Sequence, residues 1–225
     1  MNSQKMLSKS VLRMLLKFVV VTCVSIFSLS SVSADTATEN VRLTVETSVN
    51  SLVARLEEKR PLYKENTEEF YREMGGALSE LVDFRRIAAR VMGKYGRSAS
   101  VEQRDRFVET FKRSLFTTYS KALVESGKFT VQVQQANMLS PEQDKASVDI
   151  EVTAENGNKY KVVYSMYLNT GKNSWLLENI IVSGINVGLA FRDRFEQEMR
   201  TNRGDMDAVI ANWNSQLDIE ANSQG

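Results

Sequence analysis

The chain has no histidine, and its single cysteine, Cys23, lies close to the N-terminus. The rest of the chain therefore has no imidazole base, no thiolate nucleophile, no disulfide and no ordinary zinc or copper site. It also has no glycine-rich phosphate loop and no carboxylates at metal-ligand spacing. Most hydrolase mechanisms are excluded, whereas chemistry based on carboxylates, a Ser/Lys pair or tyrosine remains open.

The first 34 residues have the three parts of a secretory signal. A basic stretch is followed by an apolar run from Phe18 to Phe27 and by the small residues Val32-Ser33-Ala34. The run is about half of the roughly 20 apolar residues that a membrane span needs. We expect residues 1–34 to be a cleaved signal peptide of an exported protein; the alternative is an uncleaved anchor.

The size and charge of the remainder fit one soluble domain. Residues 35–217 are enough for a substantial core, and the polar end, 218–225, predicts a flexible tail. The whole chain has 29 Lys and Arg and 28 Asp and Glu; four of the basic residues lie in 1–34, which leaves 25 basic against 28 acidic residues. Such a balance gives no sequence-wide attraction to nucleic acid or to anionic lipid surfaces.

The first part of this domain, residues 41–126, has the apolar spacing of helices. After a polar leader over Asp35–Asn40, a helix is predicted over Val41–Glu58. A second helix is predicted to start at Asn66-Thr67, where either side chain can cap it, and to kink at Gly75-Gly76.

Two further helices are predicted before the chain changes period. Asp83 is a candidate N-cap for a helix over Phe84–Met92. The capping-box pattern Ser100-Val101-Glu102-Gln103 predicts a long helix that ends at Gly127.

Between residues 128 and 183 the apolar period falls to two, which predicts four antiparallel strands. Asn156-Gly157 is a strong hairpin signal between two of them. The last strand, from Trp175 to Val182, is apolar at nearly every position, so we expect both of its faces to be buried. Gly184 ends this strand.

The segment 185–217 returns to helical spacing. Val187, Phe191, Phe195 and Met199 recur every four residues and predict an amphipathic helix. Asp205 is a candidate cap for a last short helix that extends to Leu217.

This order of elements predicts an α+β fold, in which an antiparallel four-stranded curved sheet packs with N-terminal and C-terminal helices. The large side chains of the sheet are expected to share one core with those of the long helix: Tyr160, Tyr164, Met166, Leu168 and Trp175 with Phe107, Phe111, Phe116 and Tyr119. They either interlock completely or leave an apolar cavity for a flexible hydrocarbon ligand. The pattern does not separate these two possibilities.

If a cavity exists, the residues on faces predicted to point inward are the candidates for its lining. They are Phe84, Val91, Tyr119, Val148, Ile150, Tyr164, Met166, Val182, Ile185 and Leu189.

One basic concentration stands out, and it consists of Arg85, Arg86, Arg90, Lys94 and Arg97. It is either an ordinary solvated helix face or a docking surface for an acidic partner or for phosphate head groups.

Three carboxylates are the candidates for an enzymatic site, namely Asp149, Glu151 and Glu178. Acid–base catalysis would need buried carboxylates with shifted pKa values. Because they are expected to lie mostly on polar faces, we predict no catalytic residue and no resident metal or cofactor.

Two stretches together resemble the signatures of the MlaC, or toluene-tolerance, family. The first runs from Val82-Asp83-Phe84 through Gly93-Lys94-Tyr95 and Ser98–Arg104 to Phe107 and Phe111. The second comprises Trp175, Ile180–Ile185 and Phe191–Phe195. The chain departs from the family pattern at Gly96, often Trp, and at Phe191, often Tyr.

The resemblance implies a monomeric periplasmic carrier with a cone-shaped, NTF2-like architecture around an apolar cavity. Such a carrier holds a glycerophospholipid by its acyl chains and moves it between the two membranes of a Gram-negative envelope, which maintains outer-membrane lipid asymmetry. The implied partners are an inner-membrane ABC transporter complex with a periplasmic lipid-binding ring and an outer-membrane lipoprotein associated with a porin. The alternatives are a ligand-free periplasmic adaptor and a small carboxylate-dependent enzyme on the same fold.

Overall fold

The computed structural model describes residues 29–125 and 127–214. Most of the predicted signal peptide, 1–34, lies outside the described residues, as do the tail, 218–225, and Leu217. Within the described ranges, no helix combines the length and the hydropathy that crossing a membrane requires.

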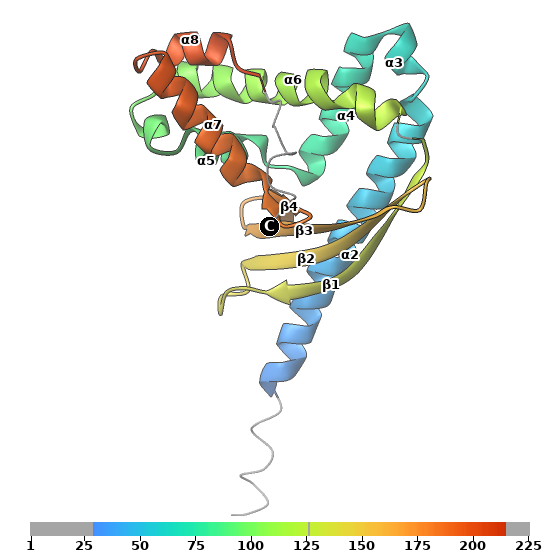
Figure 1. Ribbon diagram of the computed structural model, residues 1–225. Helices are drawn as coiled ribbons and strands as arrows, with labels where there is room; N and C mark the ends of the chain where they lie inside the picture. Colours follow the sequence, from blue (N-terminus) through green and yellow to red (C-terminus); the bar gives the residue numbers. More distant parts are fainter. Residues whose placement is uncertain (1–28, 126, 215–225) are drawn as a thin grey trace, which may run out of the picture.

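Helices come first, a sheet follows, and two helices close the chain (Figure 1). This order confirms the predicted α+β class. The helical elements are α2 (Leu29–Lys59), α3 (Leu62–Glu65), α4 (Thr67–Leu81), α5 (Phe84–Met92), the 3-10 helix η1 (Gly93–Arg97), α6 (Val101–Glu125), α7 (Val187–Thr201) and α8 (Met206–Ala211). The strands are β1 (Phe129–Met138), β2 (Lys145–Ala154), β3 (Lys159–Asn169), β4 (Ser174–Val182) and β5 (Ile185–Asn186).

The predicted capping residues begin the helices as expected. The side chains of Asn66, Asp83 and Asp205 each accept a hydrogen bond from a first-turn amide. Ser100 and Gln103 form a reciprocal capping box at the start of α6, with N–O distances of 3.1 and 3.0 Å. These local signals depend on neighbouring residues alone, which is why the sequence predicts them well.

Three helical predictions differ from the structure. The last helix, α8, ends at Ala211 and does not continue through Trp213. The expected polar leader, Asp35–Asn40, is part of α2, and Arg42 pairs there with Glu39 at 2.8 Å and with Glu46 at 3.2 Å. A break or kink is expected at Gly75-Gly76, but no break occurs, because α4 continues as one helix through both glycines. A Cβ on Gly75 would lie only 3.0 Å from the Lys112 side chain, so this glycine lets α6 approach α4.

The strands form an antiparallel sheet in the order β1-β2-β3-β4-β5. The four predicted strands are present, and β5 adds a short fifth strand. Ser183 and Gly184 turn β4 into β5 with φ values of 49° and 86°. A two-residue hairpin of this kind needs positive φ at both positions, which explains why the strand ends at Gly184.

Strand β4 carries an irregularity that matters for the site. Ser165 of β3 lies opposite Asn179, whereas Met166 lies opposite Leu177, so Glu178 is an extra residue in β4. An extra residue of this kind breaks the alternation of a strand and re-aims the side chain that follows.

The apolar face of the sheet packs against α2, not against α6. Val41, Val45 and Val49 of α2 are buried against Val148, Ile150 and Met166 of the sheet. The expectation of a core shared between the sheet and the long helix is therefore wrong. Periodicity identifies the apolar face of each element, but it does not say which two faces meet.

Two more hydrophobic clusters complete the interior. In the first, α5, α6, α7 and α8 enclose a group of aromatic rings, in which Phe107 lies 4.9 Å from Phe195 and 5.3 Å from Trp213 between ring centroids. In the second, Phe70 and Met74 of α4 pack with Leu56 and Val124. The described residues thus build three separate hydrophobic clusters.

Candidate lipid-binding site

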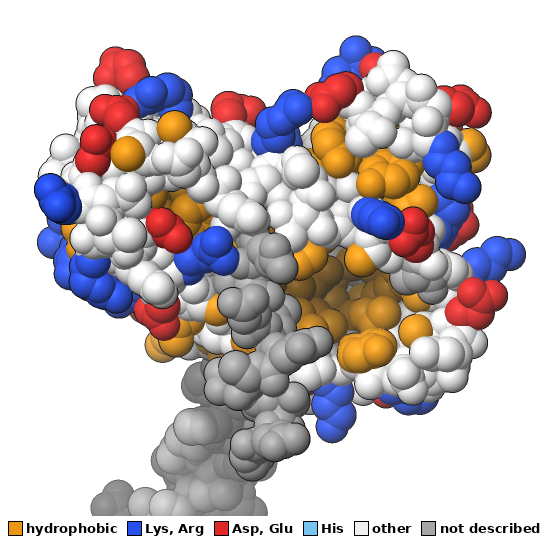
Figure 2. Space-filling view, turned by 45° about the horizontal axis from the view of Figure 1, so that its top comes forward, with side chains coloured by type: hydrophobic (Ala, Val, Ile, Leu, Met, Phe, Trp, Pro, Cys, Tyr) orange, Lys and Arg blue, Asp and Glu red, His pale blue; other side chains and the backbone are white. Residues whose placement is uncertain are grey.

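An apolar cavity lies where the three hydrophobic clusters meet. Phe111 and Phe191 come to it from the α5–α8 cluster, Leu177 from the cluster between the sheet and α2, and Phe70 and Met74 from the α4 cluster. Its volume is about 280 Å³. Figure 2 shows a hollow lined by hydrophobic side chains on this side of the molecule.

The wall of the cavity contains few polar groups, and these have partners. The Ser120 hydroxyl lies 3.3 Å from the Tyr71 hydroxyl, to which it donates. The Asn179 side-chain oxygen accepts a hydrogen bond from the Gly188 amide at 3.1 Å. The remaining lining side chains are apolar except for the Tyr119 hydroxyl: Phe70, Met74, Leu78, Val82, Phe84, Ile87, Phe111, Leu115, Phe116, Leu123, Leu177, Ile180, Val187 and Phe191. This surface suits a hydrocarbon ligand.

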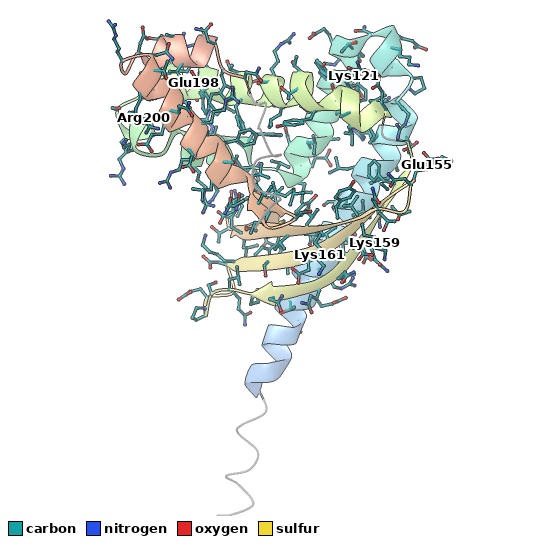
Figure 3. All side chains as sticks on the ribbon, viewed as in Figure 1. Lys121, Glu155, Lys159, Lys161, Glu198 and Arg200 are labelled. Atoms are coloured by element: carbon teal, nitrogen blue, oxygen red, sulfur yellow. The ribbon has the colours of Figure 1, made fainter. Side chains whose placement is uncertain are left out.

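The rim of the cavity includes exposed apolar side chains. Tyr119 and Leu123 of α6 line the cavity although they are 36% and 40% exposed. Lys121 lies on α6, and Lys161 lies on β3 across the space below it (Figure 3). Both lysines are exposed and neither lines the cavity. In the strand register Lys161 lies opposite Glu151, on the other face of the sheet from Val162 and Tyr164.

The structure brings together only some of the residues predicted to line a cavity. Phe84 and Tyr119 line the apolar cavity. Val91 and Leu189 line a separate polar pocket between α5 and α7. Ile185, in β5, is half-buried and belongs to neither lining.

The other five predicted lining residues lie on the face of the sheet that α2 covers. Val148, Ile150 and Met166 are buried in that core, with 3% exposure or less. Tyr164 and Val182 are half-buried beside it, and burial raises the pKa of the Tyr164 hydroxyl. Tyr164 lies directly opposite Ile180, which does line the cavity, but neither Tyr164 nor Val182 is part of the lining. A lipid-binding role for any of the ten residues remains a prediction.

Sequence reasoning missed most of the lining, including Leu78, Leu115, Ile180 and Val187. One signal was present in the long helix. Its apolar stripe continues from Phe111 through Leu115 and Tyr119 to Leu123 at four-residue intervals, while its neighbours cover only the first half of that stripe.

Glu178 is the one strongly buried carboxylate in the part of the chain that the structure describes. Its side chain is 7% exposed and pairs with Arg86 at 2.5 Å, Arg90 at 2.9 Å and Lys145 at 3.4 Å. The prediction that Glu178 lies on a polar face is wrong, because the extra residue in β4 turns it toward α5. Arg86 also stacks on the Tyr167 ring at 3.9 Å.

The carboxylates do not assemble into a catalytic group. Asp149 accepts a hydrogen bond from Gln135, and Glu151 pairs with Lys159. Among the described residues, no cluster of three or more His, Cys, Asp or Glu side chains could hold a metal ion.

The predicted basic surface is largely paired within the protein. Besides the two arginines on Glu178, Arg85 pairs with Asp105 and Lys94 with Glu196, each at 2.7 Å. The Lys94 ammonium lowers the pKa of the Glu196 carboxyl, and that carboxylate raises the pKa of Lys94. These residues therefore fasten α5 and η1 to α6, β4 and α7, whatever else they bind.

Comparisons with known proteins agree with this geometry. The MlaC protein family matches residues 46–215. The toluene tolerance protein Ttg2D of Pseudomonas putida is 37% identical over 188 residues, which are 83% of this chain and 84% of that protein. A phospholipid-binding protein from Ralstonia solanacearum, solved in complex with a phospholipid, has the same fold with a TM-score of 0.67. It is 22% identical, and the match covers 76% of this chain and 93% of the other. The chain belongs to the MlaC family.

Proposed function

We propose that this protein is a periplasmic carrier that binds glycerophospholipid by its acyl chains and shuttles it between the outer and inner membranes. The observation that carries this proposal is the apolar cavity at the junction of the three hydrophobic clusters. The likeness to a phospholipid-binding protein of the same fold supports it.

Hydrocarbon burial alone supplies enough free energy for binding. Each buried CH₂ group contributes about 0.8 kcal/mol. Burial of an acyl chain therefore supplies binding free energy without a charged anchor. The 280 Å³ cavity is slightly smaller than the ~300–1,000 Å³ range of ligand sites. We therefore expect the walls to move apart when a whole chain enters.

The proposed route needs export and two membrane partners. Residues 1–34 have the composition of an export signal. Family membership supports delivery between an inner-membrane ABC transporter complex with a lipid-binding ring and an outer-membrane lipoprotein associated with a porin, which maintains outer-membrane asymmetry. The basic surface of Arg85, Arg86, Arg90, Lys94 and Arg97 is the candidate docking face.

Lipid recovery tests the binding step directly. Protein purified without detergent from the periplasm should carry phospholipid that organic extraction releases and native mass spectrometry detects as a mass increment. Ligand-free protein with no recoverable lipid, before and after incubation with phospholipid vesicles, would favour the adaptor alternative.

A variant of the cavity wall sharpens this test. Leu78 lines the cavity but belongs to none of the three clusters, so Leu78→Glu places a charge in the cavity and leaves the core intact. We expect it to lose lipid loading by at least about tenfold, since a charged group in an apolar site is costly. Leu43→Glu, on an exposed position of α2, is the matched control and should load normally.

A further inference from the structure

A basic pocket adjoins the apolar cavity between α5, η1, β4 and the start of α7. Its volume is about 600 Å³, which is ample for a small ligand group. Four cations, Arg90, Lys94, Arg97 and Arg192, line it, and Glu178 is the one acidic residue in the lining.

The positive charge in this basic pocket is only partly neutralised. Glu178 already has three cationic partners. Glu196 is paired with Lys94 and Arg200, and acts on Arg192 only over a longer distance. Within the described ranges, neither Arg97 nor Arg192 forms an ion pair, so two guanidinium groups remain for an anion.

The chemistry of these groups favours a phosphate. Guanidinium groups bind phosphate oxygens with paired, charge-assisted hydrogen bonds. The pocket also includes Asn186, the N-cap of the 15-residue helix α7, whose positive end favours an anion. The Leu189 amide there is bonded to Asn186 and the Gly188 amide to Asn179, so the arginines provide the main contacts.

One layer of residues separates the basic pocket from the apolar cavity. Ile87, Asn179 and Gly188 line both. Gly188 has no side chain, and a Cβ there would collide with the Asn179 oxygen at 2.3 Å. The Asn179 amide nitrogen forms no hydrogen bond with another residue in the part of the chain described, so it can donate to an ester carbonyl.

We propose that this basic pocket binds the phosphate of the lipid whose acyl chains occupy the apolar cavity. The glycerol backbone then crosses the boundary beside Asn179 and Gly188. Arg97 and Arg192 contact the phosphate from the exposed side of the basic pocket. This inference rests on the proposed function, because it requires a lipid in the cavity.

The test compares two lipids that differ only in the phosphate. Phosphatidate and diacylglycerol with identical short acyl chains are titrated into the delipidated whole protein, and the two dissociation constants are measured. We expect phosphatidate to bind at least about tenfold more tightly, because charge-assisted hydrogen bonds are the strong ones. In Arg97→Gln/Arg192→Gln the preference should fall to about twofold, with diacylglycerol affinity unchanged.

Lys121→Gln/Lys161→Gln is the matched control, since these exposed lysines line neither the apolar cavity nor the basic pocket. It should keep the preference. A preference lost in the lysine variant, or kept in the arginine variant, would overturn the assignment. Equal wild-type affinities for the two lipids would overturn it while the carrier proposal stands. If neither lipid binds, the carrier proposal itself fails.

A titration with inorganic phosphate distinguishes a head-group site from an independent anion site. It should bind the lipid-free protein, perturb the amide signals of Gly93 and Arg97 in NMR spectra, and be displaced when phosphatidate is added. If phosphate and phosphatidate bind at the same time, they do not share a site. The shared site would also be contradicted if phosphate does not bind and the spectra of the arginine variant are unchanged.

Discussion

At the scale of single residues, Glu178 shows how a buried charge can hold elements together. It joins β4 to α5 through Arg86 and Arg90 and to β2 through Lys145. Removing one member of a buried ion cluster leaves the others uncompensated. The position of Glu178 is therefore structural, and it fixes the strand that separates the apolar cavity from the basic pocket.

We predict that Glu178→Gln lowers the free energy of unfolding by about 2 kcal/mol. Breaking a buried pair costs about 3–5 kcal/mol, but the three cations are 38%, 47% and 40% exposed, so water screens part of their charge. Urea unfolding followed by circular dichroism measures the change. Glu151→Gln, whose Lys159 partner is 63% exposed, should change it by less than about 0.5 kcal/mol; equal effects of the two substitutions would contradict this account.

The ion pair between Lys94 and Glu196 gives a prediction about pH. The folded-state pKa of Glu196 is lowered, chiefly by its hydrogen bond with Lys94. The stabilisation is therefore present above the unfolded pKa of about 4.3 and is lost as pH falls through the folded value. Lys94→Gln should raise the Glu196 pKa in carboxyl NMR titrations. An unchanged value would show that Lys94 is not the cause.

At the scale of elements, α2 determines what the sheet can do. It buries the sheet face on which half of the predicted lining residues lie, so that face is mostly core. The cavity instead forms between β4 and the helices α4, α5, α6 and α7.

We predict that Val45→Ala, in this helix, costs about 2 kcal/mol of stability. Val45 is completely buried against the sheet, and its truncation loses apolar contacts and leaves a void. Leu43 lies on the same helix but is 45% exposed. The free energy of unfolding of Leu43→Ala should therefore stay within about 0.5 kcal/mol of the wild-type value. Thermal and urea unfolding compare the two. A similar loss for both would mean that α2 does not pack on the sheet as described.

The elements were predictable from the sequence because their signals are local. Caps such as Asp83 and turns such as Asn156-Gly157 depend on residues that are neighbours in the chain. The partner of each apolar face was not predictable. Both α2 and α6 have an apolar stripe, but only α2 packs on the apolar face of the sheet. The burial of Glu178 was missed for another reason, because one extra residue in β4 reverses the alternation on which strand faces are predicted.

The same reasoning explains how little of the cavity wall was predicted. Phe84 and Tyr119 lie on helix faces that remain partly uncovered, and they do line it. Val148, Ile150 and Met166 lie on an equally apolar face that another helix happens to cover. Apolar character alone does not distinguish a wall from a core.

At the scale of the whole molecule, lipid binding should change stability. A ligand that binds only the folded state stabilises it by about 2.7 kcal/mol at 100 times its dissociation constant. We predict that phospholipid-loaded protein melts at a higher temperature than delipidated protein. Amide hydrogen exchange should slow in α4 and in the second half of α6, which form the wall.

Leu78→Glu separates this effect from general stabilisation. The variant should lose the lipid-dependent increase in melting temperature, while its delipidated form melts close to the delipidated wild type. An increase that persists in the variant would place the lipid outside the cavity.

The meeting of three separate clusters at one hollow has a mechanical consequence. A fatty chain seated there touches residues of all three clusters at once. The unloaded form should therefore be the more compliant of the two. In the proposed transport route, a membrane partner would then meet loaded and empty carriers that differ in stiffness.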